Sequence, residues 1–222
     1  MGHSSRSLSK PPYWDEATRA LRGNDRVLAK LIRAYPGIHL KRRGDPFTTL
    51  ARAIVGQQIS VKAADSIWRR FAACVAPDGR ASPPTRLDAH AVAGTRLDAL
   101  RRCGLSQRKS EYLRDLADHF ASGRLDPKVW RRLDDDALIA ALVEVKGIGR
   151  WTAEMFLIFH ELRADVLPLA DLGLQRAIAI HYNDGERMAP AAMRELARAW
   201  QPWRSVATWY LWRSLDPIPV EY

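Results

Sequence analysis

The chain has 222 residues, enough for one large or two small domains, and it carries 35 basic against 25 acidic side chains. The net charge of +10 favours a polyanionic partner, either nucleic acid or an anionic membrane surface. No apolar stretch approaches the roughly 20 residues of a membrane-spanning helix, and the N-terminus is polar. Cys74 and Cys103 occur without a secretory signal, so we expect reduced thiols in a cytoplasmic protein.

The N-terminal part begins with a polar segment and continues with a helical pattern. Residues 1–13 are polar and basic, and we expect them to be disordered. Apolar side chains recur at helical spacing over residues 15–35, which predicts one helix that ends at Pro36-Gly37.

A pair of glutamines interrupts the next apolar pattern. Helical spacing over residues 46–55 stops at Gly56-Gln57-Gln58 and resumes over residues 59–71. Amides at the junction of two apolar helices are unexpected as core residues. They either cap the two helices or face a ligand outside the fold.

The middle of the chain predicts two further helices, over residues 87–102 and 107–122. Arg108 and Lys109 open the second of these, and we expect both to be solvated surface residues. Three consecutive aspartates at 134–136 precede another apolar pattern. They suit a helix N-terminus, where negative charge is favoured, better than a metal site.

Two glycines then separate a pair of helical patterns. Apolar positions at 139–143 and 151–162 flank the turn that contains Gly147 and Gly149. Glycine adopts positive φ at little cost and lets a ligand approach the backbone. The sequence therefore predicts a helix-hairpin-helix whose second helix presents free N–H groups to an anion.

An acidic residue stands at the start of the following helix. Pro168 precedes Asp171, and helical spacing follows over residues 172–178. Asp171 either caps this helix or serves as a catalytic carboxylate. Two last helices are expected over 190–200 and 203–215, and without strand alternation the chain is predicted to be all-α.

These features resemble the helix-hairpin-helix–Gly/Pro–Asp superfamily of DNA glycosylases, and within it the DNA-3-methyladenine glycosylase II branch. A lone Gly-Ile-Gly turn would be weak evidence. The resemblance covers roughly residues 46–215 and rests on four segments in family order: ARAIVGQQISVKAA at 51–64, VKGIGRWTAEMF at 145–156, LPLADLGLQ at 167–175 and WQPWRSVATWYLW at 200–212.

The resemblance implies two helical lobes with the active site in the cleft between them. One lobe would span residues 46–163 and end in the helix-hairpin-helix at about 137–162. Residues 14–45 and 164–222 would form the second lobe, which carries Asp171.

The resemblance also implies a monofunctional glycosylase of base excision repair. Its substrates would be flipped-out alkylated purines of the 3-methyladenine and 7-methylguanine type in duplex DNA. Such a base is cationic and leaves without a general acid, so one carboxylate, Asp171, would stabilise the oxocarbenium-like sugar. Trp151 stands where bifunctional members carry a Schiff-base lysine, which predicts no lyase activity. The alternatives are a non-catalytic DNA-binding protein and a glycosylase for deaminated or oxidised bases.

Family positions also give the expected contacts of the base and of the DNA. Trp151, Met155 and Trp212 would line the base pocket, where ring faces favour a cation, although core packing is the alternative for the tryptophans. Gln58 takes the wedge position, whose side chain enters the gap left by the flipped nucleotide. The residues expected to bind DNA are Gln57, Gln58, Ser60, Lys146, Gly147, Gly149, Arg150 and Thr152.

Catalysis is expected to need no cofactor. Nothing after Cys103 could supply the four C-terminal cysteines of an iron–sulfur cluster, so no cluster is expected. By resemblance, the main-chain carbonyls of Val143, Val145 and Ile148 would hold a structural Na+ or K+. We expect a monomer that binds double-stranded DNA, and a cytoplasmic, nucleoid-associated location.

Overall fold

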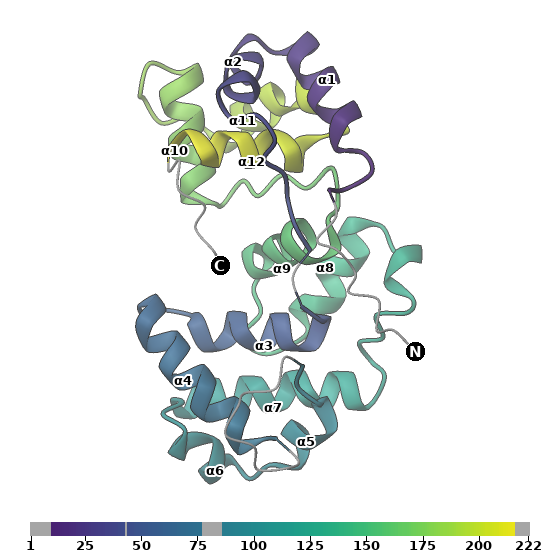
Figure 1. Cartoon of the computed structure of the whole chain (residues 1–222), viewed down its shortest axis with the longest axis vertical. Helices are drawn as coiled ribbons and strands as arrows, with labels where there is room; N and C mark the ends of the chain where they lie inside the picture. Colours follow the sequence, from purple (N-terminus) through teal and green to yellow (C-terminus); the bar gives the residue numbers. More distant parts are fainter. Residues whose placement is uncertain (1–9, 43, 77–85, 216–222) are drawn as a thin grey trace. The chain divides into compact units, whose positions relative to one another are not determined.

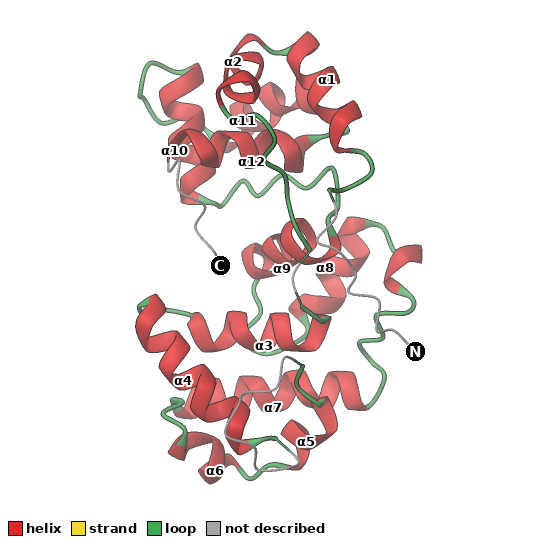
Figure 2. Cartoon of the chain, viewed as in Figure 1, coloured by secondary structure: helices red, strands yellow, loops and turns green. Residues whose placement is uncertain are grey.

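The computed structural model describes residues 10–42, 44–76 and 86–215. Over these residues the chain is helical and contains no β-strand (Figure 2), which confirms the all-α prediction. The described residues fall into two compact units. The terminal unit comprises residues 10–42 and 157–215, and the middle unit comprises residues 44–76 and 86–156.

The terminal unit joins helices from both ends of the chain around α12 (Arg204–Leu215). α12 packs against α1, α2 and α10 (Figure 1), and its residues Val206, Ala207 and Leu211 are fully buried. The other helices of this unit are α1 (Trp14–Asn24), α2 (Arg26–Ala34), the π-helix η2 (Leu157–Glu161), α10 (Leu172–Tyr182), α11 (Pro190–Leu196) and the 3-10 helix η3 (Ala197–Trp200).

The middle unit is organised around α7 (Gln107–Ala121), which packs against α3, α5 and α6 (Figure 1). Leu113, Leu116 and Ala117 form its fully buried face. The other helices of this unit are α3 (Pro46–Gly56), α4 (Val61–Cys74), α5 (Ala89–Gly94), α6 (Leu97–Arg102), the 3-10 helix η1 (Trp130–Arg132), α8 (Asp135–Val143) and α9 (Arg150–Phe156).

The single helix predicted over residues 15–35 is wrong, because Asp25 divides it into α1 and α2. Asp25 is extended, and its Oδ1 accepts hydrogen bonds from the N–H groups two and three residues further on, as an N-cap does. Its Oδ2 accepts from the Tyr182 hydroxyl at 2.8 Å and from Trp200 Nε1 at 2.9 Å. The helical spacing of apolar residues reports none of these partners.

Two further expectations are refined by the structure. The helix predicted over residues 87–102 is split into α5 and α6, because Thr95 adopts an extended conformation between them. Of the segment 1–13 expected to be disordered, residues 1–9 lie outside the described residues. Tyr13 stacks on Trp203, with ring centroids 5.8 Å apart.

Candidate active site and DNA-binding elements

Asp171 occupies the N-cap position of α10, within the terminal unit. Its Oδ1 accepts a hydrogen bond from the Leu174 N–H at 2.7 Å, as expected of an acid at a helix start. The preceding loop is tied to the same helix, because the Asp171 N–H donates to the Pro168 carbonyl and Gln175 Nε2 donates to the Leu169 carbonyl. The carboxylate is thus half-buried and held at the N-terminal end of a helix dipole.

Trp212 of α12 lies against Asp171. Its indole Nε1 donates to Asp171 Oδ1 at 2.8 Å, and its ring stacks on Phe159 with centroids 5.6 Å apart and planes at 11°. Gly173 makes this approach possible, since a Cβ there would lie 3.1 Å from both Asp171 Oδ1 and Trp212 Cδ1. The structure therefore brings together two predicted site residues that are 41 positions apart.

The predicted helix-hairpin-helix is formed by α8 and α9, and its two glycines differ in their surroundings. Gly147 has φ +85°, and a Cβ there would lie 2.2 Å from the Tyr112 ring, so this position requires glycine. Gly149 is exposed, and a Cβ there would meet nothing within 4 Å. Gly149 therefore has open space at its Cα, whereas the Tyr112 ring fills that space at Gly147.

The polar residues expected to bind DNA at the hairpin are exposed or partly exposed. Lys146 is exposed, and its Nζ lies 4.0 Å from Asp115 Oδ1. Arg150 is also exposed at the start of α9, but it pairs with Glu154 at 3.0 Å and with Asp136 at 3.3 Å. A DNA phosphate at Arg150 would therefore compete with two carboxylates. Thr152 is partly buried in the first turn of α9.

Trp151 and Met155, the other two predicted pocket residues, lie one turn apart on α9 in the middle unit. Trp151 is 45% exposed, which is unusual for a side chain of its size, and Met155 is partly buried. Ordinary core packing therefore does not account for the position of Trp151.

The glutamine pair forms the turn between α3 and α4. Gln57 Nε2 donates to the Gly147 carbonyl of the hairpin at 2.9 Å, while Gln58 has φ +58° and an exposed side chain. Ser60, also predicted to bind DNA, caps α4 by accepting from the Ala63 N–H at 3.3 Å. Ser60 thus caps the start of α4, and Gln57 occupies the C-cap position of α3 through its backbone N–H, while its side chain reaches the hairpin.

Lys109 was expected to be a solvated surface residue, and this prediction is wrong. It is partly buried, and its Nζ donates to the carbonyls of Val55 at 2.8 Å and Gln57 at 2.6 Å. Burial lowers the pKa of this lysine. The last carbonyls of a helix have no partner within it, and the last turn of α3 contains no basic residue. In the sequence, the lack of a basic residue in this turn indicates that the last carbonyls of α3 need a donor from another element.

The structure gives a capping role to Asp134, the first of the three aspartates at 134–136. Asp134 Oδ1 accepts from the Ala137 N–H at 2.8 Å at the start of α8. No group of three or more metal-ligating side chains occurs in residues 10–42, 44–76 and 86–215. Of the carbonyls expected to hold a monovalent cation, that of Val143 ends α8. The other two lie in the following turn, where the Ile148 N–H donates to the Val145 carbonyl at 3.1 Å.

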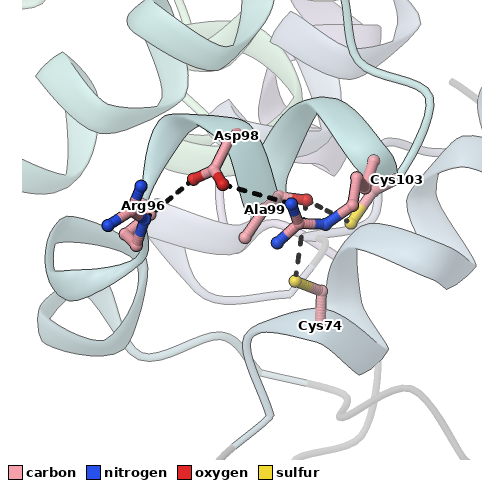
Figure 3. A network of polar contacts seen from close by, with 6 residues as sticks. Cys74, Arg96, Asp98, Ala99 and Cys103 are labelled. Atoms are coloured by element: carbon pink, nitrogen blue, oxygen red, sulfur yellow. Dashed lines mark hydrogen bonds and ion pairs between the residues drawn. The ribbon is translucent and has the colours of Figure 1, made fainter.

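The two cysteines lie close together in the middle unit (Figure 3). Both thiols point to the Ala99 carbonyl, with Cys103 Sγ at 3.3 Å and Cys74 Sγ at 4.0 Å. Burial and the neighbouring Cys74 thiol raise the pKa of Cys103 to about 12. The Cys103 thiol is therefore protonated at neutral pH, which is the form that binds metals poorly.

The chain is similar in sequence to DNA-3-methyladenine glycosylases. DNA-3-methyladenine glycosylase 1 of Schizosaccharomyces pombe is 31% identical over 192 residues, which cover 86% of this chain and 82% of the relative. DNA-3-methyladenine glycosylase 2 of Escherichia coli is 30% identical over 202 residues, which cover 88% of this chain and 67% of the relative.

The fold is also similar to solved structures of 3-methyladenine glycosylases. DNA-3-methyladenine glycosidase of Bacillus halodurans aligns with a TM-score of 0.82 at 34% identity, over 90% of this chain and 89% of that one. The S. pombe 3-methyladenine DNA glycosylase, in complex with abasic DNA, aligns with a TM-score of 0.75 at 29% identity, over 93% and 98% of the two chains. Residues 51–202 match the family model of the HhH-GPD superfamily base excision DNA repair proteins, and the chain belongs to this superfamily.

Proposed function

We propose that this chain is a monofunctional DNA glycosylase that hydrolyses the N-glycosidic bond of alkylated purines in duplex DNA. The observation that carries the proposal is the half-buried Asp171 carboxylate, held by the Leu174 N–H and the Trp212 indole at the start of α10. A protein that only binds the DNA backbone needs no such carboxylate. The named relatives act, by their names, on 3-methyladenine.

The chemistry follows from the charge of the substrate. A purine methylated at N3 or N7 is cationic, and it leaves as a neutral base when the electrons of the C1′–N bond pass to it. The sugar becomes oxocarbenium-like, and the Asp171 carboxylate stabilises that positive charge. Water then bonds to C1′ and releases its proton to solvent, which leaves an abasic sugar.

Access to the bond requires that the nucleotide leave the base stack. The flipped base would contact Trp151, Met155 and Trp212, and a ring face would favour a cationic base. On α9, Trp151 is exposed and Met155 is partly buried. Exposed Gln58 would fill the gap in the duplex. The residues that would contact the DNA backbone are Gln57, Ser60, Lys146, Gly147, Gly149, Arg150 and Thr152.

Trp151 also decides whether the enzyme cleaves the abasic strand. The indole cannot form the Schiff base that a lysine at this position would form with the sugar. We therefore propose hydrolysis without a lyase step.

The remaining parts of the proposal concern assembly and ions. The protein would act as a monomer on double-stranded DNA, at the nucleoid in the cytoplasm. Within the described residues, no helix has both the length and the apolar character to span a membrane. The carbonyls of Val143, Val145 and Ile148 would hold Na+ or K+ at the C-terminal end of α8, where positive charge is favoured. Thermal unfolding in K+, Na+ or a bulky organic cation tests this: a midpoint that depends only on ionic strength contradicts it.

One assay separates the proposed activity from its alternatives. Base release is measured side by side on duplexes that contain 7-methylguanine, 8-oxoguanine, uracil or hypoxanthine, and borohydride is added to trap any covalent adduct. We expect release of 7-methylguanine and no trapped adduct. Release from the oxidised or deaminated duplexes alone would overturn the substrate assignment, and binding without any release would overturn the enzyme assignment.

A further inference from the structure

The middle unit holds the α3–α4 turn and the hairpin against one face of α7. Lys109, Tyr112 and Asp115 are spaced three residues apart on α7, so they lie along one side of the helix. We call these three residues the α7 brace. Each of them contacts one or both of the two segments proposed to engage DNA.

Lys109 holds the α3–α4 turn. Its ammonium bridges the carbonyls of Val55 and Gln57, one on each side of Gly56, at 2.8 and 2.6 Å. These carbonyls end α3, where a cation and a donor are both favoured. The next residue, Gln58, has φ +58°, a region that non-glycine residues adopt only when their surroundings enforce it. The bridge fixes the backbone on the N-terminal side of that strained residue.

Tyr112 and Asp115 hold the hairpin. The Tyr112 ring occupies the space that a Gly147 Cβ would need. Asp115 Oδ2 accepts from the Lys146 N–H at 2.9 Å. Gln57 links the turn to the hairpin. Its side chain donates to the Gly147 carbonyl, and its main-chain carbonyl accepts from Lys109. The turn and the hairpin are thus tied to α7 and to each other.

We propose that the α7 brace, through Lys109, is a positioning device for lesion extrusion. It keeps Gln58 presented at a fixed distance from the hairpin, so that backbone binding at the hairpin drives Gln58 into the duplex. This inference rests on the proposed function. Lys109 would act through the turn that it holds, and so as a positioning residue.

If the turn is loosened, the loss in base release should depend on how difficult it is to extrude the damaged nucleotide. Unstacking and unpairing cost less for a lesion that has no pairing partner. A loose turn should therefore slow base release most where the lesion is paired. A general loss of folding or of Asp171 chemistry would slow release equally from paired and unpaired lesions.

The test uses Lys109→Met, which keeps an unbranched side chain and removes the ammonium. Arg108→Met is the matched control, because Arg108 is exposed on the same turn of α7 and the change in charge is the same. Single-turnover release of 7-methylguanine is measured opposite cytosine and opposite an abasic analogue. A misplaced group costs up to about a hundredfold, so we expect Lys109→Met to lose at least about tenfold more on the paired duplex than on the unpaired one. Arg108→Met should lose equally little on both, and Lys109→Arg should restore most of the paired rate.

If Lys109→Met lost release rate equally on both duplexes, or lost none, the proposed role of the α7 brace would be overturned. If Lys109→Met does not fold, as judged by thermal unfolding, Asp115→Ala probes the other end of the same face and decides on the same ratio. A wild-type protein that releases no base from either duplex refutes the proposed function instead, so the two failures are distinguishable.

Discussion

At the level of single residues, the Asp171 carboxylate is oriented by two donors with different origins. The Leu174 N–H belongs to the helix that Asp171 itself caps, whereas the Trp212 indole comes from α12. Both donate to Oδ1, and Gly173 leaves room for the indole to do so. A carboxylate held in this way needs little reorganisation when positive charge develops beside it.

We expect Trp212→Phe to slow base release while it preserves the fold. Phenylalanine keeps a ring for the stack on Phe159 but lacks the N–H. A hydrogen bond to a charged group contributes about 1.5–3 kcal/mol, so single-turnover release should fall roughly ten- to hundredfold. Trp209→Phe is the control, because Trp209 is on the same helix and its Nε1 has no hydrogen-bond partner among the described residues. Equal losses in the two variants would reduce Trp212 to a packing residue.

The sequence predicts one of these two donors to Asp171. An aspartate directly before an apolar helical pattern predicts an N-cap, and the backbone bond follows from that position. The indole bond depends on how α12 lies against α10, and helical spacing carries no information on the direction of a side-chain donor. The exposure of Trp151 could not be predicted for the same reason.

At the level of elements, the hairpin shows how much a short motif determines. The Gly-Ile-Gly spacing predicts a turn between two helices, and the structure confirms it. The spacing does not tell which glycine is required by the packing and which has open space beside it. That distinction depends on Tyr112 of α7, which packs on Gly147 and leaves Gly149 untouched.

Alanine should therefore affect folding stability at Gly147 and DNA binding at Gly149. Gly147→Ala combines positive φ with a Cβ on the Tyr112 ring, and we expect a loss of at least about 1–3 kcal/mol in the free energy of unfolding. Gly149→Ala has no such conflict and should unfold like the wild type. Its methyl group would project toward the DNA backbone and weaken binding. Thermal unfolding and DNA-binding titrations of both variants decide, and a destabilised Gly149→Ala with normal affinity would contradict this division of roles.

At the level of the whole molecule, partly or fully buried tyrosines in the terminal unit link stability to alkaline pH. Burial raises the pKa of Tyr13, Tyr182 and Tyr210, and the negative charge of Asp25 adds to the shift at Tyr182. Each folded-state pKa lies above the unfolded value of about 10. The protonated phenols therefore contribute stability that is fully present below about pH 10 and is lost as pH rises above it.

We expect the free energy of unfolding to fall above pH 10, by about 1.4 kcal/mol per pH unit for Tyr182 alone. Tyr182→Phe removes the ionisable group together with its hydrogen bond to Asp25. The variant should be less stable than the wild type at pH 7, yet lose stability less steeply above pH 10. Denaturant unfolding at several pH values measures both effects. Parallel curves for the two proteins would show that Tyr182 does not contribute.

The arrangement of the chain as a whole was predictable in part. The spacing of apolar residues predicts an all-α chain, and most helices lie close to the predicted ranges. The break at Asp25 was not predictable, because Tyr182 and Trp200 stabilise it from more than 150 positions away in the sequence. The half-buried position of Lys109 depends in the same way on the packing of α7 against α3.

The substitution Asp171→Asn tests whether Asp171 is the catalytic carboxylate. Asparagine caps a helix as well as aspartate does, so the fold and DNA affinity should remain. The measurement is single-turnover release of 7-methylguanine from duplex DNA, with thermal unfolding and DNA binding as controls. We expect release to fall at least about a hundredfold, because the negative charge that stabilises the transition state is gone. A folded, DNA-binding Asp171→Asn protein that releases the base at near wild-type rate would show that the Asp171 carboxylate is not catalytic.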